Sequence, residues 1–464
     1  MKLTLEKIAE FTGGNIRGNK KITVRSAAID SRKLGEDCLF IALEGEHTDG
    51  HRYVDQAFAA GAAAALVVKG KYDGAADAVV ETEETAAAMG EIAAGILRER
   101  GDSLIKIAVT GSVGKTSTKD MIASVVGGHF ITLKSELNHN NELGLPLTVM
   151  RLEAEHEALV TEMGMRGLGQ IEYLAKIVRP DIAVITNIGI SHLETLGSRE
   201  NILRAKLEIC KGMKPGAKLI LNGDNDMLSE ETLVRGILKE YGADEIEIMT
   251  FGTEENSDYR AENIRGSNYE LLTPSGQRFD VRLQVPGVHN VYNSMAAVCA
   301  ANAAGISAEE AVDTLYLFGE EASRQKIVEM PWGFVIDDTY NAGPESMAAS
   351  LSVLRDMEAD LKVAALGDML ELGVLSAHSH RNVGALASET ADVLLAVGPQ
   401  SVIYYETFDG QRKMHVADSA EGARVLLPLI REYAQKGLKI GVLVKGSNAM
   451  RMNLISEALF NHFT

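Results

Sequence analysis

The stretch KIAVTGSVGKTSTKD, residues 106–120, carries residue types in an order that suits phosphate binding. An apolar run leads into a turn with Gly111 and Gly114, and Lys115 and Thr116 then open a predicted helix. Backbone N–H groups at a helix N-terminus would face phosphate oxygens. The lysine can reach the outer phosphates, and the threonine hydroxyl can coordinate Mg²⁺. We therefore expect the phosphates of a nucleotide to be held by Gly111, Ser112, Val113, Gly114, Lys115, Thr116 and Ser117.

This loop is shorter than the common phosphate-binding loop. Two residues separate Gly111 from Gly114, whereas the common form has four residues between its first glycine and Gly-Lys-Ser/Thr. On the residues alone, the alternative is a glycine turn before a helix with an incidental lysine.

Three other polar residues are candidates for a catalytic site. Glu162 ends an apolar run, where a carboxylate could hold a hard cation. His192 lies in the loop after the next apolar run, and loops at the carboxyl ends of strands gather ligands. Lys206 lies in a predicted helix, where a solvated surface lysine is the simpler interpretation.

The elements that would position these residues repeat four times. Apolar strands, each with a loop and a helix, are predicted at 105–111, 156–164, 181–189 and 217–226. Such repeats indicate a doubly wound, largely parallel sheet, which binds ligands at the carboxyl ends of its strands.

The length of 464 residues predicts several domains. We expect an α/β protein of three domains. They are a mixed α/β domain over residues 1–82, a central ATPase domain of the phosphate-loop type with a parallel sheet over 83–317, and a Rossmann-like domain over 318–464.

Composition limits the partners. The net charge of −19 argues against nucleic acid and membrane surfaces, which are themselves anionic. Cys38, Cys210 and Cys299 are scattered and odd in number, which favours a reducing compartment. No apolar run is long enough to span a bilayer. We expect a cytoplasmic monomer that binds no nucleic acid and inserts into no membrane.

The chain also resembles a known family. Seven segments occur in the order found in Mur ligases, the ATP-dependent amide ligases of peptidoglycan precursor synthesis. The segments are TGSVGKTST, NHNNELGLPLT, TEMGM, TNIGISHLE, AKLEI, NGDND and GVHNVYNSMAA. The short phosphate loop is that family's own form, so the resemblance favours ATP as the nucleotide. One segment of the first domain and two of the last resemble the member that adds the terminal dipeptide: DSRKLGEDCLFIALEGEHTDGHRYVDQAFAAGA, DDTYNAGPESM and ALGDMLELG.

The resemblance implies roles for residues that the pattern alone leaves open. Thr116 and Glu162 would hold one Mg²⁺, and His192 with a carbamylated Lys206 would hold a second. The adenine would lie against Asn290 and Asn293. The last domain would contribute Arg324 and Asp338 to the phosphates and ribose of ATP. The first domain would bind the uridine diphosphate through Ser31, Arg32, Thr48, Asp49 and His51.

By the same resemblance, the substrates would be a UDP-N-acetylmuramoyl-tripeptide and D-alanyl-D-alanine, joined through an acyl phosphate. Two alternatives are related ligases: one that adds another amino acid, and one that extends folate with glutamate. A third belongs to a different class, a non-catalytic nucleotide-binding regulator that keeps the fold for contacts with partners.

Overall fold

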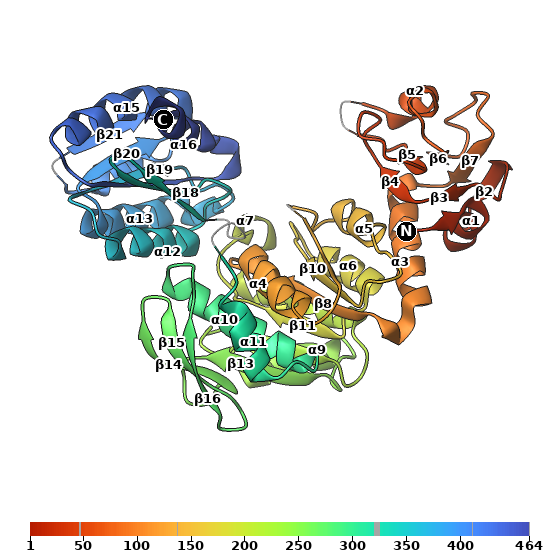
Figure 1. The fold of residues 1–464 in the computed structure, drawn as a ribbon, viewed down its shortest axis with the longest axis horizontal. Coiled ribbons are helices and arrows are strands. Elements are labelled where there is room, and N and C mark those ends of the chain that lie inside the picture. Colours follow the sequence, from red (N-terminus) through yellow and green to blue (C-terminus); the bar gives the residue numbers. More distant parts are fainter. Residues whose placement is uncertain (46–47, 137, 320–324, 411, 464) are drawn as a thin grey trace.

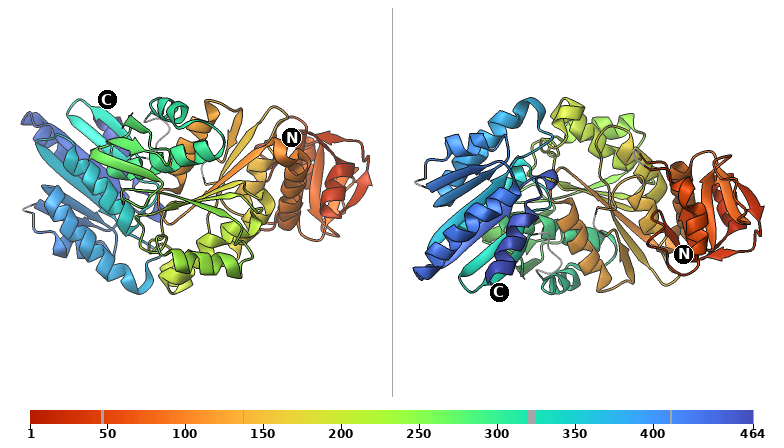
Figure 2. Two further views of the ribbon diagram at one scale, coloured as in Figure 1. Left: turned by 90° about the horizontal axis from the view of Figure 1, so that it is seen from below. Right: turned by 90° about the horizontal axis from the view of Figure 1, so that it is seen from above.

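The computed structural model describes residues 1–463 apart from 46–47, 137, 320–324 and 411. The chain folds into three α/β domains, each built on its own main sheet. Figure 1 shows the N-terminal and C-terminal domains at opposite upper corners, with the central domain between and below them. The two further views in Figure 2 place the three domains in a row, in chain order. The predicted fold class is confirmed.

The N-terminal domain has a five-stranded sheet in the order β2-β7-β6-β5-β4. Strands β4 to β7 run parallel, and β2 is antiparallel to β7. The elements are β1 (Leu3–Thr4), α1 (Leu5–Thr12), β2 (Asn15–Gly18), β3 (Thr23–Val24), β4 (Ser26–Ala28), β5 (Cys38–Ile41), α2 (Val54–Ala59), β6 (Ala64–Val68) and β7 (Ala78–Thr82). Strands β1 and β3 form a separate antiparallel pair.

Helix α3 (Thr85–Arg100) joins the first domain to the second and packs against both. A side chain at Gly95 would collide with the ring of Phe11 on α1, and one at Gly90 would collide with the Tyr173 hydroxyl on α6 (Gln170–Val178) of the central domain. Both glycines therefore permit close helix packing, which ties the N-terminal domain firmly to the central one.

The central domain is a nine-stranded sheet in the order β16-β15-β14-β13-β12-β11-β8-β10-β9. Its strands are β8 (Ile105–Thr110), β9 (Thr132–Lys134), β10 (Ala158–Glu162), β11 (Ile182–Ile185), β12 (Lys218–Asn222), β13 (Glu247–Gly252), β14 (Tyr259–Arg265), β15 (Asn268–Leu272) and β16 (Arg278–Arg282). Strands β8 to β14 pair in parallel, and β15 and β16 extend the sheet as an antiparallel meander. All four predicted repeats are therefore strands of one parallel sheet.

Helices cover both faces of this sheet. They are α4 (Lys115–Gly127), α5 (Gly144–Val149), α6 (Gln170–Val178), α7 (Leu193–Leu196), α8 (Arg199–Leu207), α9 (Glu231–Glu240), α10 (Val288–Ala303) and α11 (Ala308–Leu315). One core lies under α3, α5, α6 and α8, and the other under α4 and α10. The strands are buried on both sides, so they appear in the sequence as continuous apolar runs.

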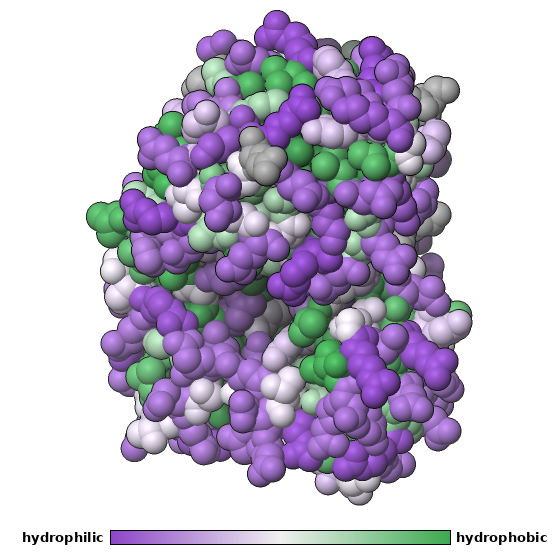
Figure 3. All heavy atoms as spheres, turned by 90° about the vertical axis from the view of Figure 1, so that its left-hand side faces the viewer, coloured by the Kyte–Doolittle hydropathy of each residue, from purple (hydrophilic) through white to green (hydrophobic). Residues whose placement is uncertain are grey.

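The C-terminal domain has a six-stranded sheet in the order β17-β18-β22-β19-β20-β21, parallel except for β17. Its strands are β17 (Lys326–Met330), β18 (Gly333–Asp338), β19 (Leu361–Gly367), β20 (Val393–Val397), β21 (Arg412–Val416) and β22 (Ile440–Lys445). Its helices are α12 (Pro344–Asp356), α13 (Ser376–Thr390), α14 (Val402–Thr407), α15 (Ser419–Gln435) and α16 (Asn453–Phe463). Figure 3 faces this domain and shows a mostly hydrophilic surface with small scattered apolar patches.

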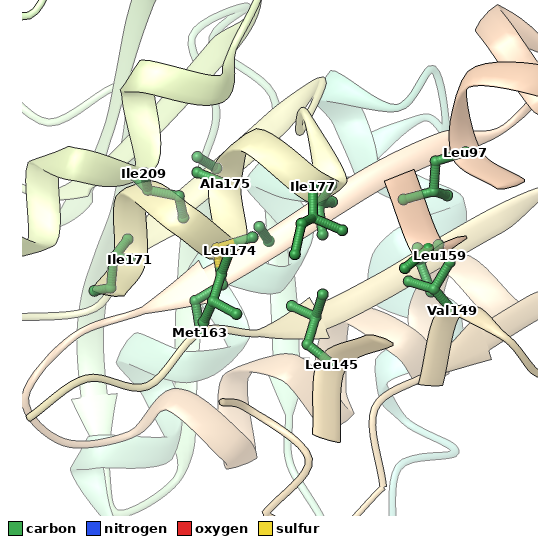
Figure 4. Close-up of a cluster of buried hydrophobic side chains, with 14 of the residues drawn as sticks. Leu97, Leu145, Val149, Leu159, Met163, Ile171, Leu174, Ala175, Ile177 and Ile209 are labelled. Carbon is green, nitrogen blue, oxygen red and sulfur yellow. The ribbon is translucent and has the colours of Figure 1, made fainter. Parts of the chain in front are cut away.

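The core that supports the site is tightly packed. Figure 4 shows side chains of α3, α5, α6 and β10 meeting in one cluster, among them Leu97, Leu145, Leu159 and Leu174. The strand that carries Glu162 is fixed by this cluster, because Leu159 and Met163 on either side of that glutamate are fully buried in it. Rigid packing of this kind allows the strand end to present a polar group at a defined position.

Candidate active site

A cavity of about 470 Å³ lies between the central and C-terminal domains. A hollow below the C-terminal domain is visible on the face drawn in Figure 3. The central domain lines the cavity with its phosphate loop, the ends of β11 and β12 and the first turn of α10, and the C-terminal domain contributes residues 338–350 and Lys445. A volume in this range suits a nucleotide-sized ligand.

The predicted phosphate loop connects β8 to α4. Two glycines allow its path: Gly111 and Gly114 have φ angles of 146° and 80°. A side chain at Gly111 would meet the Thr186 hydroxyl at 2.0 Å, so only glycine fits beside the end of β11. The Lys115 ammonium donates to the carbonyl groups of Gly111 and Ser112 at 2.9 and 3.0 Å. Of the seven predicted loop residues, all but Gly111 line the cavity.

A second loop, residues 186–192, supports the phosphate loop from the neighbouring strand. Asn187 accepts a hydrogen bond from the Val113 N–H at 3.0 Å and donates to the Val113 carbonyl at 3.1 Å. The Gly189 N–H donates to the Ser112 hydroxyl at 2.9 Å. Sequence reasoning missed Asn187, although a polar residue directly after a buried strand was a usable signal.

The hydroxyl and the carboxylate predicted to hold Mg²⁺ lie together. Strands β8 and β10 are parallel neighbours, so Glu162 at the end of β10 lies beside the start of α4. The Thr116 hydroxyl donates to Glu162, and the Asn140 amide donates to the other carboxylate oxygen at 2.8 Å. Hard oxygen donors of this kind suit Mg²⁺. Asn140 was not singled out from the sequence.

His192 is partly buried and adopts a left-handed backbone with φ 65°. Its burial lowers its pKa to about 4, and the positive charges of Lys206, Lys115 and Arg166 act in the same direction. The imidazole is therefore neutral at pH 7 and keeps a lone pair for a cation. Its Nδ1 atom lies 3.2 Å from Glu371 of the C-terminal domain.

Lys206 is not the solvated surface lysine that its helix pattern suggested. Its side chain is buried, with 1% of the residue exposed. Burial lowers its pKa well below the usual range, and the charge of Lys115 adds to this, while Glu162 and Glu208 partly oppose it. The structure therefore favours the neutral amine, which is the form that can react with CO₂.

Of the four predicted metal residues, Thr116 lines the cavity, whereas Glu162, His192 and Lys206 lie behind the phosphate loop and do not line it. The charges of Lys115 and Glu162 act on Lys206, and the charge of Lys206 acts on His192. Within the described part of the chain, no group of three His, Cys, Asp or Glu side chains gathers as a metal site. The donors here are therefore of mixed type: a hydroxyl, a carboxylate, an imidazole and a lysine.

Asn290 and Asn293 lie in the first two turns of α10, and both line the cavity. Asn293 donates to the Asn290 side chain at 3.0 Å and accepts from the Thr118 hydroxyl at 3.0 Å. Asn290 donates to the Pro286 carbonyl at 2.7 Å. These bonds fix both amides beside the phosphate-loop helix.

In the C-terminal domain, Asp338 ends β18 and lines the cavity. Burial alone would raise its pKa, but the Lys445 ammonium at 2.6 Å and the Ser350 hydroxyl at 2.6 Å lower the pKa overall. Lys445 was missed from the sequence because its partner is more than a hundred residues away. Arg324, the other predicted residue of this domain, lies outside the described residues.

The five residues predicted for the uridine diphosphate lie in the N-terminal domain, away from this cavity. Ser31 and Arg32 follow β4, and the other three lie after β5, its parallel neighbour. Arg32 makes a bidentate contact with Asp30, with both N–O distances 2.9 Å. The five residues are Ser31, Arg32, Thr48, Asp49 and His51.

His51 is buried, with 5% of the residue exposed. Its Nδ1 lies 2.6 Å from Asp49, and its Nε2 accepts the Val68 N–H at 2.9 Å. Both ring nitrogens are thus engaged inside the domain. In this structure His51 anchors the turn that carries Asp49, so a direct contact with a ligand stays a prediction.

No helix in the described ranges has the length and apolar character needed to cross a bilayer. All three cysteines are buried and unpaired.

Comparison with known proteins identifies relatives along the whole chain. Three family models match: "Mur ligase family, catalytic domain" over residues 23–96, "Mur ligase middle domain" over 109–301 and "Mur ligase, glutamate ligase domain" over 323–448. The UDP-N-acetylmuramoyl-tripeptide–D-alanyl-D-alanine ligase of Bacillus subtilis is 36% identical, with 99% of this chain and 98% of the relative covered.

Solved structures give the same relationship. A crystal structure of MurF from Acinetobacter baumannii matches with a TM-score of 0.87 and 32% identity, covering 99% of each chain. The MurF ligase of Thermotoga maritima in complex with ADP matches with a TM-score of 0.80 and 26% identity, covering 95% of this chain and 98% of that one.

Proposed function

The chain belongs to the Mur ligase family, and on that premise we propose that it joins D-alanyl-D-alanine to a UDP-N-acetylmuramoyl-tripeptide at the expense of ATP. The observation that carries this proposal is the interdomain cavity, which gathers a phosphate loop and two fixed amides under a second domain, with the buried Glu162 carboxylate bonded to Thr116 of that loop. The relative of the same length from Bacillus subtilis carries that activity in its name.

The reaction would proceed in two steps. The γ-phosphoryl group of ATP passes to the terminal carboxylate of the tripeptide, which gives an acyl phosphate and ADP. The amine of D-alanyl-D-alanine then attacks the acyl carbon, and phosphate leaves from the tetrahedral intermediate. Phosphoryl transfer of this kind depends on positioning and on neutralisation of charge rather than on covalent chemistry by the protein.

Each part of the cavity suits one part of ATP. The N–H groups at the start of α4 and the Lys115 ammonium would neutralise the phosphates. Asn290 and Asn293, held by fixed hydrogen bonds, would face the adenine. The lowered pKa of Asp338 keeps it ionised as an acceptor for the ribose hydroxyls. Arg324 would add a positive charge from the C-terminal domain.

The donor set fits Mg²⁺. Thr116 and Glu162, already in contact, would hold one ion through oxygen atoms. His192 and Lys206 would hold a second, provided that Lys206 is carbamylated, since an ammonium cannot ligate a cation. The complete burial of this lysine and the lowered pKa that results support the carbamate: the free amine adds CO₂ and loses one proton. Bound Mg²⁺ would supply charge neutralisation at the transferring phosphoryl group.

The N-terminal domain would hold the uridine diphosphate through Ser31, Arg32, Thr48, Asp49 and His51. The tripeptide would then extend toward the cavity, because the carbonyl to be activated must meet the γ-phosphate. We further propose that the protein works as a monomer and that it lies in the cytoplasm. The three unpaired cysteines support a reducing compartment such as the cytoplasm. Size-exclusion chromatography with light scattering tests the monomer.

The function is tested with the purified protein, ATP and Mg²⁺. Tripeptide substrates that end in lysine and in diaminopimelate are each supplied with and without D-alanyl-D-alanine, and product mass and phosphate are measured. The proposal predicts a pentapeptide product and phosphate in equal amounts. Both a tripeptide substrate and D-alanyl-D-alanine should be required for their formation. Phosphate release that needs neither substrate, or product formed equally well from L-alanyl-L-alanine, would contradict it.

A further inference from the structure

Two carboxylates of the C-terminal domain reach across the domain boundary to one loop of the central domain. Glu345 in the first turn of α12 accepts the Ile190 N–H at 3.3 Å. Glu371, in the loop that follows β19, has a carboxylate oxygen 3.2 Å from Nδ1 of His192. The loop they contact is the one that supports the phosphate loop through Asn187 and Gly189.

Glu371 is held in place by its own domain. Its backbone is left-handed, with φ 62°, a conformation that is uncommon for a residue with a side chain. The two residues before it are fixed by hydrogen bonds: the Met369 N–H donates to His380 at 3.2 Å, and the Leu370 N–H donates to the Ser447 hydroxyl at 2.9 Å. Surrounding structure that overrides a local preference in this way is typical of functional positions.

The other side of the contact is equally constrained. His192 is also left-handed, and helix α7 begins directly after it. Gly373 packs so closely on α7 that a side chain there would meet Glu194 at 3.1 Å. The two segments therefore also meet closely two residues beyond the His192–Glu371 contact, at Gly373 and Glu194.

An ordinary surface ion pair is a poor account of this contact. The Glu371 side chain is 66% exposed, and an exposed pair contributes little to stability. A carboxylate at Nδ1 has another well-known effect: it accepts a hydrogen bond from Nδ1–H, which fixes the ring and leaves Nε2 with a lone pair for a cation.

We propose that Glu371 is a positioning residue for His192, and that docking of the C-terminal domain thereby completes the cation site beside the phosphate loop. Glu371 touches neither nucleotide nor substrate in this account. It acts through the imidazole, so that the site reaches full affinity for a cation only when the two domains are together. The inference rests on the proposed function only in taking His192 as a cation ligand.

The first test reads the tautomer of His192 without any substrate turnover. The protein is labelled with ¹⁵N-histidine, the His192 signals are assigned with His192→Gln, and spectra are recorded with ADP and no divalent cation. The proposal predicts the Nδ1–H tautomer in the native protein and a shift to Nε2–H, the form preferred by free imidazole in water, in Glu371→Ala. An Nε2–H tautomer in the native protein, or no change in the variant, would overturn it.

The second test measures Mn²⁺ affinity by electron paramagnetic resonance with ADP bound. We expect Glu371→Ala to weaken binding by about 10- to 100-fold. Glu371→Gln, whose amide oxygen can still accept a hydrogen bond from Nδ1–H, should lose less affinity. Glu389→Gln, an exposed glutamate of the same domain on α13, is the matched control and should bind Mn²⁺ as the native protein does.

These outcomes separate the inference from the proposed function. If the ligase assay fails while the tautomer and Mn²⁺ results hold, Glu371 positions His192 in an enzyme with another substrate. If the native protein is an active ligase but Glu371→Ala keeps native Mn²⁺ affinity, the positioning role is wrong and the function stands. Circular dichroism and thermal unfolding of each variant confirm that the fold is intact.

Discussion

The Lys445 ammonium lies 2.6 Å from an oxygen of Asp338, and the two residues pair directly across the parallel strands β22 and β18. Lys445 is buried, with 2% of the residue exposed, and Asp338 is partly buried. The pair therefore joins two strand ends at the floor of the cavity and fixes the carboxylate expected to meet the ribose.

We expect Asp338→Ala to destabilise the protein by about 3 kcal/mol, because it would leave the Lys445 charge buried without its partner. Replacing both residues, as Asp338→Ala with Lys445→Met, should cost less than the sum of the two single changes Asp338→Ala and Lys445→Met. Urea unfolding of the three variants measures this coupling. Additive effects would show that the two side chains do not support each other.

The same pair predicts a pH dependence. The folded pKa of Asp338 lies below its usual value of 3.8, so the folded state binds this proton less readily than the unfolded chain does. The stabilisation is present above pH 3.8 and is lost as pH falls through the lower, folded pKa. The fall in stability below about pH 4 should therefore be shallower in the double variant than in the native protein, measured by urea unfolding across that range.

Lys115→Ala should reduce ligase turnover by about a hundredfold or more and leave the fold intact. The ammonium lies over its own loop, bound to the carbonyls of Gly111 and Ser112, where it can swing to the phosphates. Loss of such a charge contact costs a few kcal/mol at the transition state. Lys176→Ala, on the exposed end of α6, serves as the control. Unchanged turnover in Lys115→Ala would show that the loop is structural.

Lys206→Ala should lose activity far out of proportion to any loss of stability. If the carbamate supplies a ligand oxygen, acetate or another short carboxylate should restore part of the rate. Lys206→Arg keeps the charge and length but cannot be carbamylated in the same way, so it should stay inactive. Activity of both variants is measured with and without added carboxylates. Full activity of Lys206→Arg would show that a carbamate on Lys206 is not required.

Asp49→Ala should weaken binding of the UDP-sugar peptide with little change in ATP affinity. Asp49 lies in the N-terminal domain and accepts the His51 N–H at 3.0 Å as an N-cap, so the change would also loosen the turn by about 1 kcal/mol. Calorimetry with each ligand separates the two sites. If both affinities fell together, the two sites would not be independent.

The strands and the phosphate loop could be predicted because their signals are local. The apolar runs that became β8, β10, β11 and β12 are buried on both faces, so their pattern does not depend on distant parts of the chain. Gly111 and Gly114 carry the turn by their own conformational freedom. For the antiparallel strands β15 and β16, the sequence predicted only a region rich in residues that favour β-strands.

Other features depend on contacts that no local pattern records. Lys206 looked like a surface residue because its helix has many polar neighbours, yet the fold buries it. The roles of Asn140 and Glu371 became visible only when strands and domains brought them to Glu162 and His192. A polar residue in a loop gives no sign of its partner when that partner is tens or hundreds of residues away.

The most direct test of the account follows the oxygen atoms of the tripeptide carboxylate. A UDP-N-acetylmuramoyl-tripeptide labelled with ¹⁸O in its terminal carboxylate is incubated with the protein, ATP, Mg²⁺ and D-alanyl-D-alanine, and the released phosphate is analysed by mass spectrometry. An acyl phosphate leaves one labelled oxygen in each phosphate, because the oxygen that bridged carbon and phosphorus departs with phosphorus. The account predicts phosphate with one ¹⁸O atom in step with amide formation. Unlabelled phosphate released with the amide product would contradict it.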